Sequence, residues 1–144
     1  KDSPQNENCH FYYFIKRKLS CKQSADHARA DDENVRFVIE WAGAEDTEEY
    51  TVYVYMENKT DRNLMYAWDL VSVNGYMIDP FWAMAVSAGK KACSEITFYR
   101  SDLAANGIED VENIEFTLTV SDYDNWEADY LVNKTFTYQP VSVG

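Results

Sequence analysis

No pair of residues in this chain restricts its fold as strongly as Asn74-Gly75. The pair lies between two runs of apolar, β-branched and aromatic residues that together span 69–86. A two-residue type I′ turn needs φ > 0 at both central positions, and Asn followed by Gly tolerates this best. The pair therefore predicts a β-hairpin. Because Pro80 supplies no N–H to a strand ladder, we expect a bulge or a change of sheet near Asp79-Pro80.

Alternating apolar and polar residues predict further strands on both sides of the hairpin. In the first of them Val35, Phe37, Ile39 and Trp41 fall on one side, as in a strand with one buried face. The segment 101–107 predicts a short helical turn between strands. Strands are predicted over 35–41, 49–57, 64–73, 76–78, 81–86, 92–99, 113–121 and 131–138. About eight strands at a turn spacing of roughly 8–12 residues indicate an all-β, immunoglobulin-like antiparallel sandwich.

The chain divides near residue 33 into two parts of different charge. Residues 1–31 carry 6 basic and 4 acidic side chains, and residues 32–144 carry 7 basic and 21 acidic ones. The predicted parts are an N-terminal segment over 1–32 and a sandwich over 33–144. The net charge of −12 argues against nucleic acid as a partner, because phosphate contacts need clustered Lys and Arg.

The N-terminal segment begins with an aromatic run that ends in a basic cluster, over 9–19, followed by a polar linker. We interpret the run as a strand of the domain's own sheet. Two functional alternatives are a membrane-interface contact and an edge strand covered by a partner.

Catalytic motifs are missing from the sequence of the predicted sandwich. Both histidines, His10 and His27, precede it, so residues 35–144 contain no histidine triad and no metal-binding His-Glu-x-x-His helix. The glycines are too far apart for a phosphate-binding loop or a dinucleotide fingerprint. We therefore expect a protein that is not an enzyme and carries no cofactor.

The sequence contains two groups of potential metal ligands. The first is Cys9, His10, Cys21 and His27, whose spacing differs from the close ligand pairs of structural zinc sites. The second is the acidic loop with Asp122, Asp124 and Asp129, which offers oxygen ligands for calcium but lacks the glycine and terminal glutamate of an EF-hand loop. A solvated loop is the favoured interpretation, and no metal is expected.

Three cysteines, Cys9, Cys21 and Cys93, form an odd set rather than a disulfide framework. One disulfide and three free thiols are both compatible with this number. Cys93 falls on the predicted outer face of its strand, where Glu95 disfavours a thiolate.

Aromatic side chains provide the candidate binding residues, which are Trp82, Tyr123 and Trp126. Flat aromatic faces exposed on a sandwich can stack on sugars or anchor a protein partner. Tyr53 and Tyr55 belong to the same aromatic set. The favoured alternative is that these residues pack in the second sheet or under loops, as large aromatic residues usually do.

Five short motifs resemble those of the telokin-like, immunoglobulin-like domains of unknown function in exported lipoproteins of Gram-positive gut bacteria. They are Glu57-Asn58-Lys59-Thr60, Asp69-Leu70-Val71-Ser72-Val73-Asn74-Gly75-Tyr76, Ala88-Gly89-Lys90-Lys91, Ser101-Asp102-Leu103 and Ile114-Glu115-Phe116. The resemblance covers roughly residues 33–138. It implies an extracytoplasmic module, secreted or attached to the cell surface. Glu7-Asn8 before Cys9 is not a lipobox, so a membrane tether would lie outside residues 1–144.

Two functions follow from these observations as expectations. The first is a non-catalytic protein-interaction or scaffold module at the cell surface. The second is a carbohydrate-binding module that uses exposed Trp and Tyr side chains.

Overall fold

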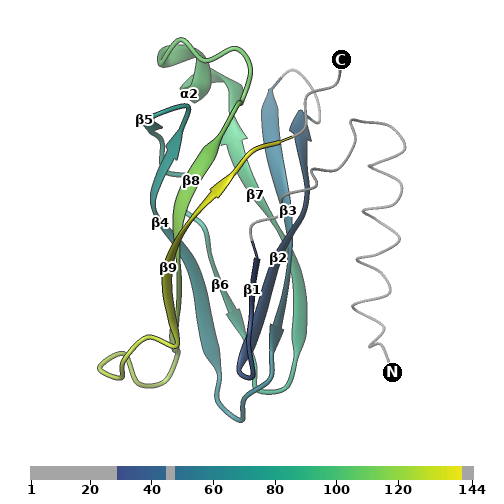
Figure 1. The fold of residues 1–144 in the computed structure, drawn as a ribbon, viewed down its shortest axis with the longest axis vertical. Helices are drawn as coiled ribbons and strands as arrows, with labels where there is room; N and C mark the ends of the chain where they lie inside the picture. Colours follow the sequence, from purple (N-terminus) through teal and green to yellow (C-terminus); the bar gives the residue numbers. More distant parts are fainter. Residues whose placement is uncertain (1–28, 45–47, 141–144) are drawn as a thin grey trace.

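The computed structural model describes residues 29–44 and 48–140. Within these ranges the chain forms two antiparallel sheets that make a sandwich, and one short helix (Figure 1). The predicted all-β sandwich is confirmed. The aromatic-basic run over 9–19 and the zinc candidates lie outside the described residues.

The two sheets have different strand orders. The first has the order β1-β2-β3-β7, with β1 (Arg29–Asp31), β2 (Val35–Ala44), β3 (Glu49–Asn58) and β7 (Lys91–Tyr99). The second has the order β5-β4-β8-β9, and β6 also pairs with β4. The strands of this sheet are β4 (Leu64–Val73), β5 (Tyr76–Met77), β6 (Ala83–Val86), β8 (Ile114–Asp122) and β9 (Val132–Tyr138). The helix α2 (Arg100–Ala105) follows β7. The orders β2-β3-β7 and β4-β8-β9 match strands A-B-E and C-F-G of an immunoglobulin sandwich.

The first sheet begins earlier than the predicted boundary at residue 33. Arg29–Asp31 forms β1, which pairs antiparallel with β2. Residues that the sequence analysis assigned to a polar linker therefore form part of the sandwich edge.

The predicted hairpin turn is confirmed. Asn74 and Gly75 have φ angles of 51° and 89°, and Val73 pairs with Tyr76 across the turn. The Asn74 side chain also donates a hydrogen bond to the Asp110 carbonyl oxygen (2.8 Å) and accepts one from the Glu112 N–H (2.8 Å). The turn is thereby fixed to the loop before β8.

The chain after this turn stays on the same sheet edge. Both β5 and β6 pair with β4, and residues 78–82 interrupt the pairing between them. The interruption of strand pairing expected at Asp79-Pro80 is therefore confirmed, and of the two alternatives offered for it the change of sheet does not occur. The register irregularity lies in the neighbouring strand β4, between Asp69 and Ser72, where Leu70 has a φ of 52°.

Aromatic rings form the centre of the core between the sheets. Trp68 stacks on Phe116 with ring centroids 3.8 Å apart, and Phe37 makes edge contacts with both rings. Trp82, the residue directly before β6, contacts the rings of Phe37 and Trp68. These side chains come from both sheets, so their packing joins the two layers.

A second, smaller cluster lies on the outer face of the first sheet. Trp41 and Tyr53 are each 1% exposed, and their rings lie 5.0 Å apart. Trp41 was expected on the same face as Phe37 and Ile39. That prediction is wrong, because a register shift between Ile39 and Trp41 turns the tryptophan to the other face, beside Tyr53. Tyr53 and Tyr55 are buried, in agreement with the packed alternative.

Asn58, at the end of β3, joins three segments through one buried side chain. Its Nδ2 donates to the carbonyl oxygens of Arg62 (2.7 Å) and Val86 (2.8 Å), and its Oδ1 accepts from the Thr60 N–H (2.9 Å). Loss of the Asn58 side chain would leave the buried groups that it binds without hydrogen bonds, which costs about 1–3 kcal/mol of folding stability.

We expect Asn58→Ala to lower the free energy of unfolding by about 1–3 kcal/mol, measured by urea titration. Asn133, which also begins an Asn-Lys-Thr sequence but is exposed on β9, provides the matched control. Asn133→Ala is expected to stay within about 0.5 kcal/mol of the unmodified protein. Equal effects of the two changes would contradict this account of Asn58.

Candidate functional site

A groove lies where the edge of one sheet meets the edge of the other. Residues 78–81, from the segment between β5 and β6, form one side, and residues 97–99 of β7 with Asp102 of α2 form the rest. Its volume is about 220 Å³. We call this cavity, with the residues that line it, the edge groove.

Phe81 projects from the first side of the edge groove. Its N–H donates a hydrogen bond to Asp79 Oδ1 (2.7 Å), which closes a tight turn around Pro80. Phe81 has a φ of 54° and a side chain that is 87% exposed. A non-glycine residue in this left-handed region costs roughly 1–2 kcal/mol. The fold therefore holds a large apolar side chain in water at a conformational cost, which is a pattern found at binding sites.

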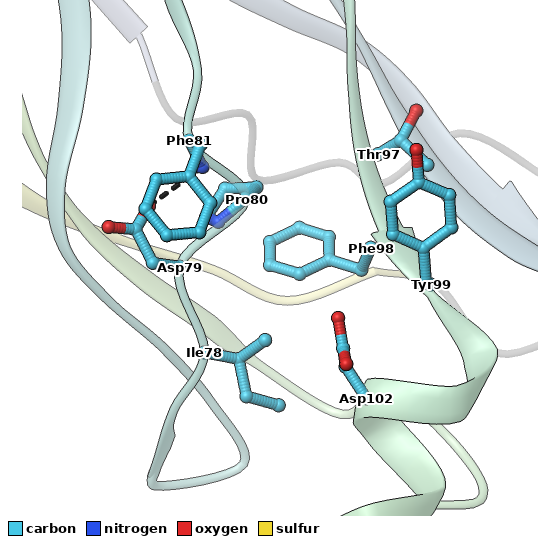
Figure 2. A pocket seen from close by; sticks show the side chains of 8 residues that line it. All are labelled: Ile78, Asp79, Pro80, Phe81, Thr97, Phe98, Tyr99 and Asp102. Carbon is cyan, nitrogen blue, oxygen red and sulfur yellow. Dashed lines mark hydrogen bonds between the residues drawn. The ribbon is translucent and has the colours of Figure 1, made fainter.

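The other side of the edge groove comes from the junction of β7 and α2. Tyr99, the last residue of β7, is 54% exposed. Figure 2 shows Asp79 with Phe81 on one side and Asp102 with Tyr99 on the other. Phe98 lies between them, and because it is buried it forms the floor. The edge groove is thus lined by aromatic rings and two carboxyl groups.

More exposed apolar side chains lie on the strands that border the edge groove. Leu70, Tyr76 and Met77 are all exposed, and they belong to the β4–β5 hairpin. The N–H of Ile78, a groove residue, donates to the carbonyl oxygen of Val71, beside Leu70 (3.1 Å). An apolar surface at one sheet edge is typical of a protein-interaction site.

The predicted binding residues do not come together. Trp82 is 9% exposed, packs against Phe37 and Trp68, and donates its indole N–H to Ser94 Oγ (2.9 Å). Trp82 therefore follows the packed alternative and not the binding assignment, because β6 resumes pairing with β4 directly after it and places the ring in the core.

Tyr123 and Trp126 are exposed, which differs from the packed alternative, and Trp126 is 83% exposed. They lie in the loop between β8 and β9, at the opposite end of the sandwich from α2 (Figure 1). Their role in binding stays a prediction.

Two carboxylates of the acidic loop, Asp122 and Asp124, hold the loop and join it to the turn before β4. Asp122 is buried; its Oδ1 accepts from the Asp124 N–H (2.9 Å), and its Oδ2 lies 3.4 Å from Arg62 Nη1. Asp124 Oδ2 accepts from Asn63 Nδ2 (3.1 Å). Asp122, Asp124 and Asp129 do not form a metal-binding group, and residues 29–44 and 48–140 contain no group of three such ligands.

Cys93 is disulfide-bonded. Its strand position opposite Tyr55 places it on the outer face of the first sheet, beside the Trp41 and Tyr53 cluster. The other cysteines of the chain, Cys9 and Cys21, precede the described residues. One disulfide, rather than three free thiols, is thus the arrangement of the structure.

The chain matches no protein-family model, and a comparison with curated proteins finds no match. In the part of the chain that the structure describes, no helix has the length and apolar character needed to cross a membrane.

Sequence reasoning missed the edge groove. Phe81 was assigned to a strand, although the preceding Asp79-Pro80 is a turn signal whose aspartate can accept a hydrogen bond from the residue two positions later. This signal was sufficient to place Phe81 in a turn. The position of Tyr99 and Asp102 opposite Phe81 carries no signal in the sequence, because they follow Phe81 by 18 and 21 residues and belong to other elements, β7 and α2.

Proposed function

We propose that this chain is a non-catalytic protein-interaction module that binds its partner at the edge groove. The observation that carries the proposal is Phe81, an exposed aromatic side chain held at positive φ by the Asp79 hydrogen bond. Aromatic anchors dominate the binding energy of protein interfaces. Exposed Tyr99 lines the same groove, and Leu70 and Met77 are exposed on the adjoining β4–β5 hairpin.

An extracytoplasmic location is the second part of the proposal. The disulfide at Cys93 supports it, because disulfides persist mainly in oxidising compartments. The resemblance to domains of exported lipoproteins points in the same direction. Together they favour a module that works outside the cytoplasm, secreted or at the cell surface.

Carbohydrate binding is a second candidate function, at a different site. The loop between β8 and β9 exposes Tyr123, Trp126 and Tyr130. Exposed aromatic faces in one loop can stack on sugar rings. This candidate uses the end of the sandwich opposite the edge groove.

Phe81→Asn separates the binding role of Phe81 from its structural role. Asn tolerates the left-handed region better than Phe, and an exposed ring contributes little burial, so we expect about 0.5–1 kcal/mol of added stability. Thermal unfolding measures the change. Tyr123→Asn, which replaces an exposed aromatic residue at ordinary φ, is the control and is expected to give no gain.

The proposal is tested by probing a random-peptide array and a glycan array with the unmodified protein, Phe81→Asn and Trp126→Ala. We expect peptides that bind the unmodified protein to lose at least about tenfold in affinity for Phe81→Asn, and to keep their affinity for Trp126→Ala. Peptide affinities that are the same for Phe81→Asn and for the unmodified protein would refute the edge groove as the interface. Glycan binding that disappears in Trp126→Ala would favour the second candidate.

A further inference from the structure

We infer that the edge groove receives a Lys or Arg side chain of a partner polypeptide. This inference rests on the proposed function and adds the chemistry of the residue that is recognised. Three features of the edge groove carry it: its charge, the arrangement of its aromatic rings and its size.

The charge of the edge groove is negative on both sides. Asp79 contributes one carboxylate from the segment before β6, and Asp102 contributes another from α2. Among the described residues that line the groove, none is basic, and no ion pair is found for either aspartate within these ranges. A cationic side chain would complement both carboxylates, and the net charge of −12 would attract a basic partner over longer distances.

Asp79 keeps capacity to accept hydrogen bonds from such a partner. Its Oδ1 accepts one hydrogen bond, from the Phe81 N–H at 2.7 Å. A carboxylate offers about four lone-pair sites. The hydrogen bond that shapes the loop therefore fixes the carboxylate beside Phe81, and the second oxygen, on the side of Phe81 away from Phe98 in Figure 2, remains an acceptor for an ammonium or guanidinium group at the groove rim.

The aromatic rings favour the same ligand. Phe81 and Tyr99 stand on opposite sides of the edge groove, with Phe98 between them (Figure 2). A cation that approaches the face of an aromatic ring is attracted by the ring quadrupole, and the aliphatic stem of Lys or Arg packs on apolar surface. Carboxylates next to aromatic rings thus suit both the charged end and the stem of one side chain.

The size of the edge groove favours a single side chain over a whole small molecule. Its volume of about 220 Å³ is below the roughly 300–1,000 Å³ of sites that enclose drug-sized ligands. Leu70 and Met77, exposed on the β4–β5 hairpin that leads into the groove segment, offer apolar surface for the residues that flank the bound side chain.

The test is a calorimetric titration of the disulfide-intact protein with four peptides of equal length. They share apolar flanking residues and differ only at the centre, which is Arg, Lys, norleucine or Glu. We expect the Arg and Lys peptides to bind about tenfold more tightly than the norleucine peptide at low salt, and the Glu peptide to bind most weakly. The difference should shrink at high salt, where exposed charges are screened.

Two variants remove the charges without changing the shape of the edge groove. Asp79→Asn keeps an oxygen that can accept the Phe81 hydrogen bond, and Asp102→Asn changes an exposed position. Asp61→Asn is the control, because it makes the same charge change away from the groove. Asp61 lies in the turn before β4, whereas the groove segment follows the other end of the β4–β5 hairpin. We expect each groove variant to reduce the preference for Arg and Lys by about threefold, and Asp61→Asn to leave it unchanged.

The outcomes separate this inference from the proposed function. Norleucine binding equal to Arg and Lys binding, but lost in Phe81→Asn, would overturn the cation inference and keep the interaction site. Equal affinity for all four peptides that is unchanged in Phe81→Asn would overturn both the cation inference and the interaction site. The absence of binding to any of the four peptides would do the same. Free butylamine that binds as tightly as the Lys peptide would overturn recognition of a polypeptide.

Discussion

Trp82→Ala is expected to lower the free energy of unfolding by about 3–5 kcal/mol and the Tm by roughly 10 °C. The ring is 9% exposed and lies against Phe37 and Trp68, with centroid distances of 6.2 and 6.1 Å. Its removal leaves a cavity between the two sheets and an unpaired Ser94 hydroxyl. Denaturant titration measures the loss.

Trp126→Ala is the matched control, because it removes the same side chain from a position that is 83% exposed. We expect its free energy of unfolding to stay within about 0.5 kcal/mol of the unmodified protein. Similar stability of both variants would contradict the buried position of Trp82. The comparison also matters for function: weaker ligand binding by Trp82→Ala would reflect loss of the fold, whereas weaker binding by Trp126→Ala would indicate a surface contact.

Loss of the Cys93 disulfide is expected to cost about 2–5 kcal/mol of stability. The bond must close a long loop, since the other cysteines precede residue 29, and long loops lose the most entropy in the unfolded chain. Cys93→Ser, or reduction by a thiol reagent, should therefore lower the denaturation midpoint. An unchanged midpoint would contradict a structural disulfide.

Alkylation of the denatured, unreduced protein followed by mass spectrometry gives an independent readout. One disulfide among three cysteines leaves one free thiol, so a single alkyl group is expected. Three added groups would show a reduced protein and would weaken the extracytoplasmic proposal. Cys9→Ser and Cys21→Ser then identify the partner of Cys93, because the change at the partner abolishes the bond and the other change leaves it intact.

The hairpin shows which parts of the fold were predictable. Asn74-Gly75 specifies its turn through the φ angles of two adjacent residues, and the structure has both angles positive. The alternation in β8 likewise predicted its buried face, since Ile114, Phe116 and Leu118 all lie in the core. In both cases the determining interactions are local.

The positions of two tryptophans, Trp41 and Trp82, could not be predicted from the sequence. Period-2 alternation placed Trp41 on the inner face, but one irregular position after Ile39 reverses every later side chain of the strand. Trp82 was named as a candidate binding residue, yet strand pairing resumes at Ala83 and directs the ring into the core, as the packed alternative has it. The resemblance to exported lipoprotein domains stays a proposal.

The sequence by itself determined most strands, the hairpin turn and the absence of histidine from residues 35–144, because strand alternation, turn angles and residue types are local properties. Only the tertiary structure decided where the edge groove lies. Phe81 lies in the segment between β5 and β6 of the second sheet, Tyr99 ends β7 of the first, and their approach depends on how the two sheets pack. Packing between layers is a collective result of many side chains, and no short stretch of sequence encodes it.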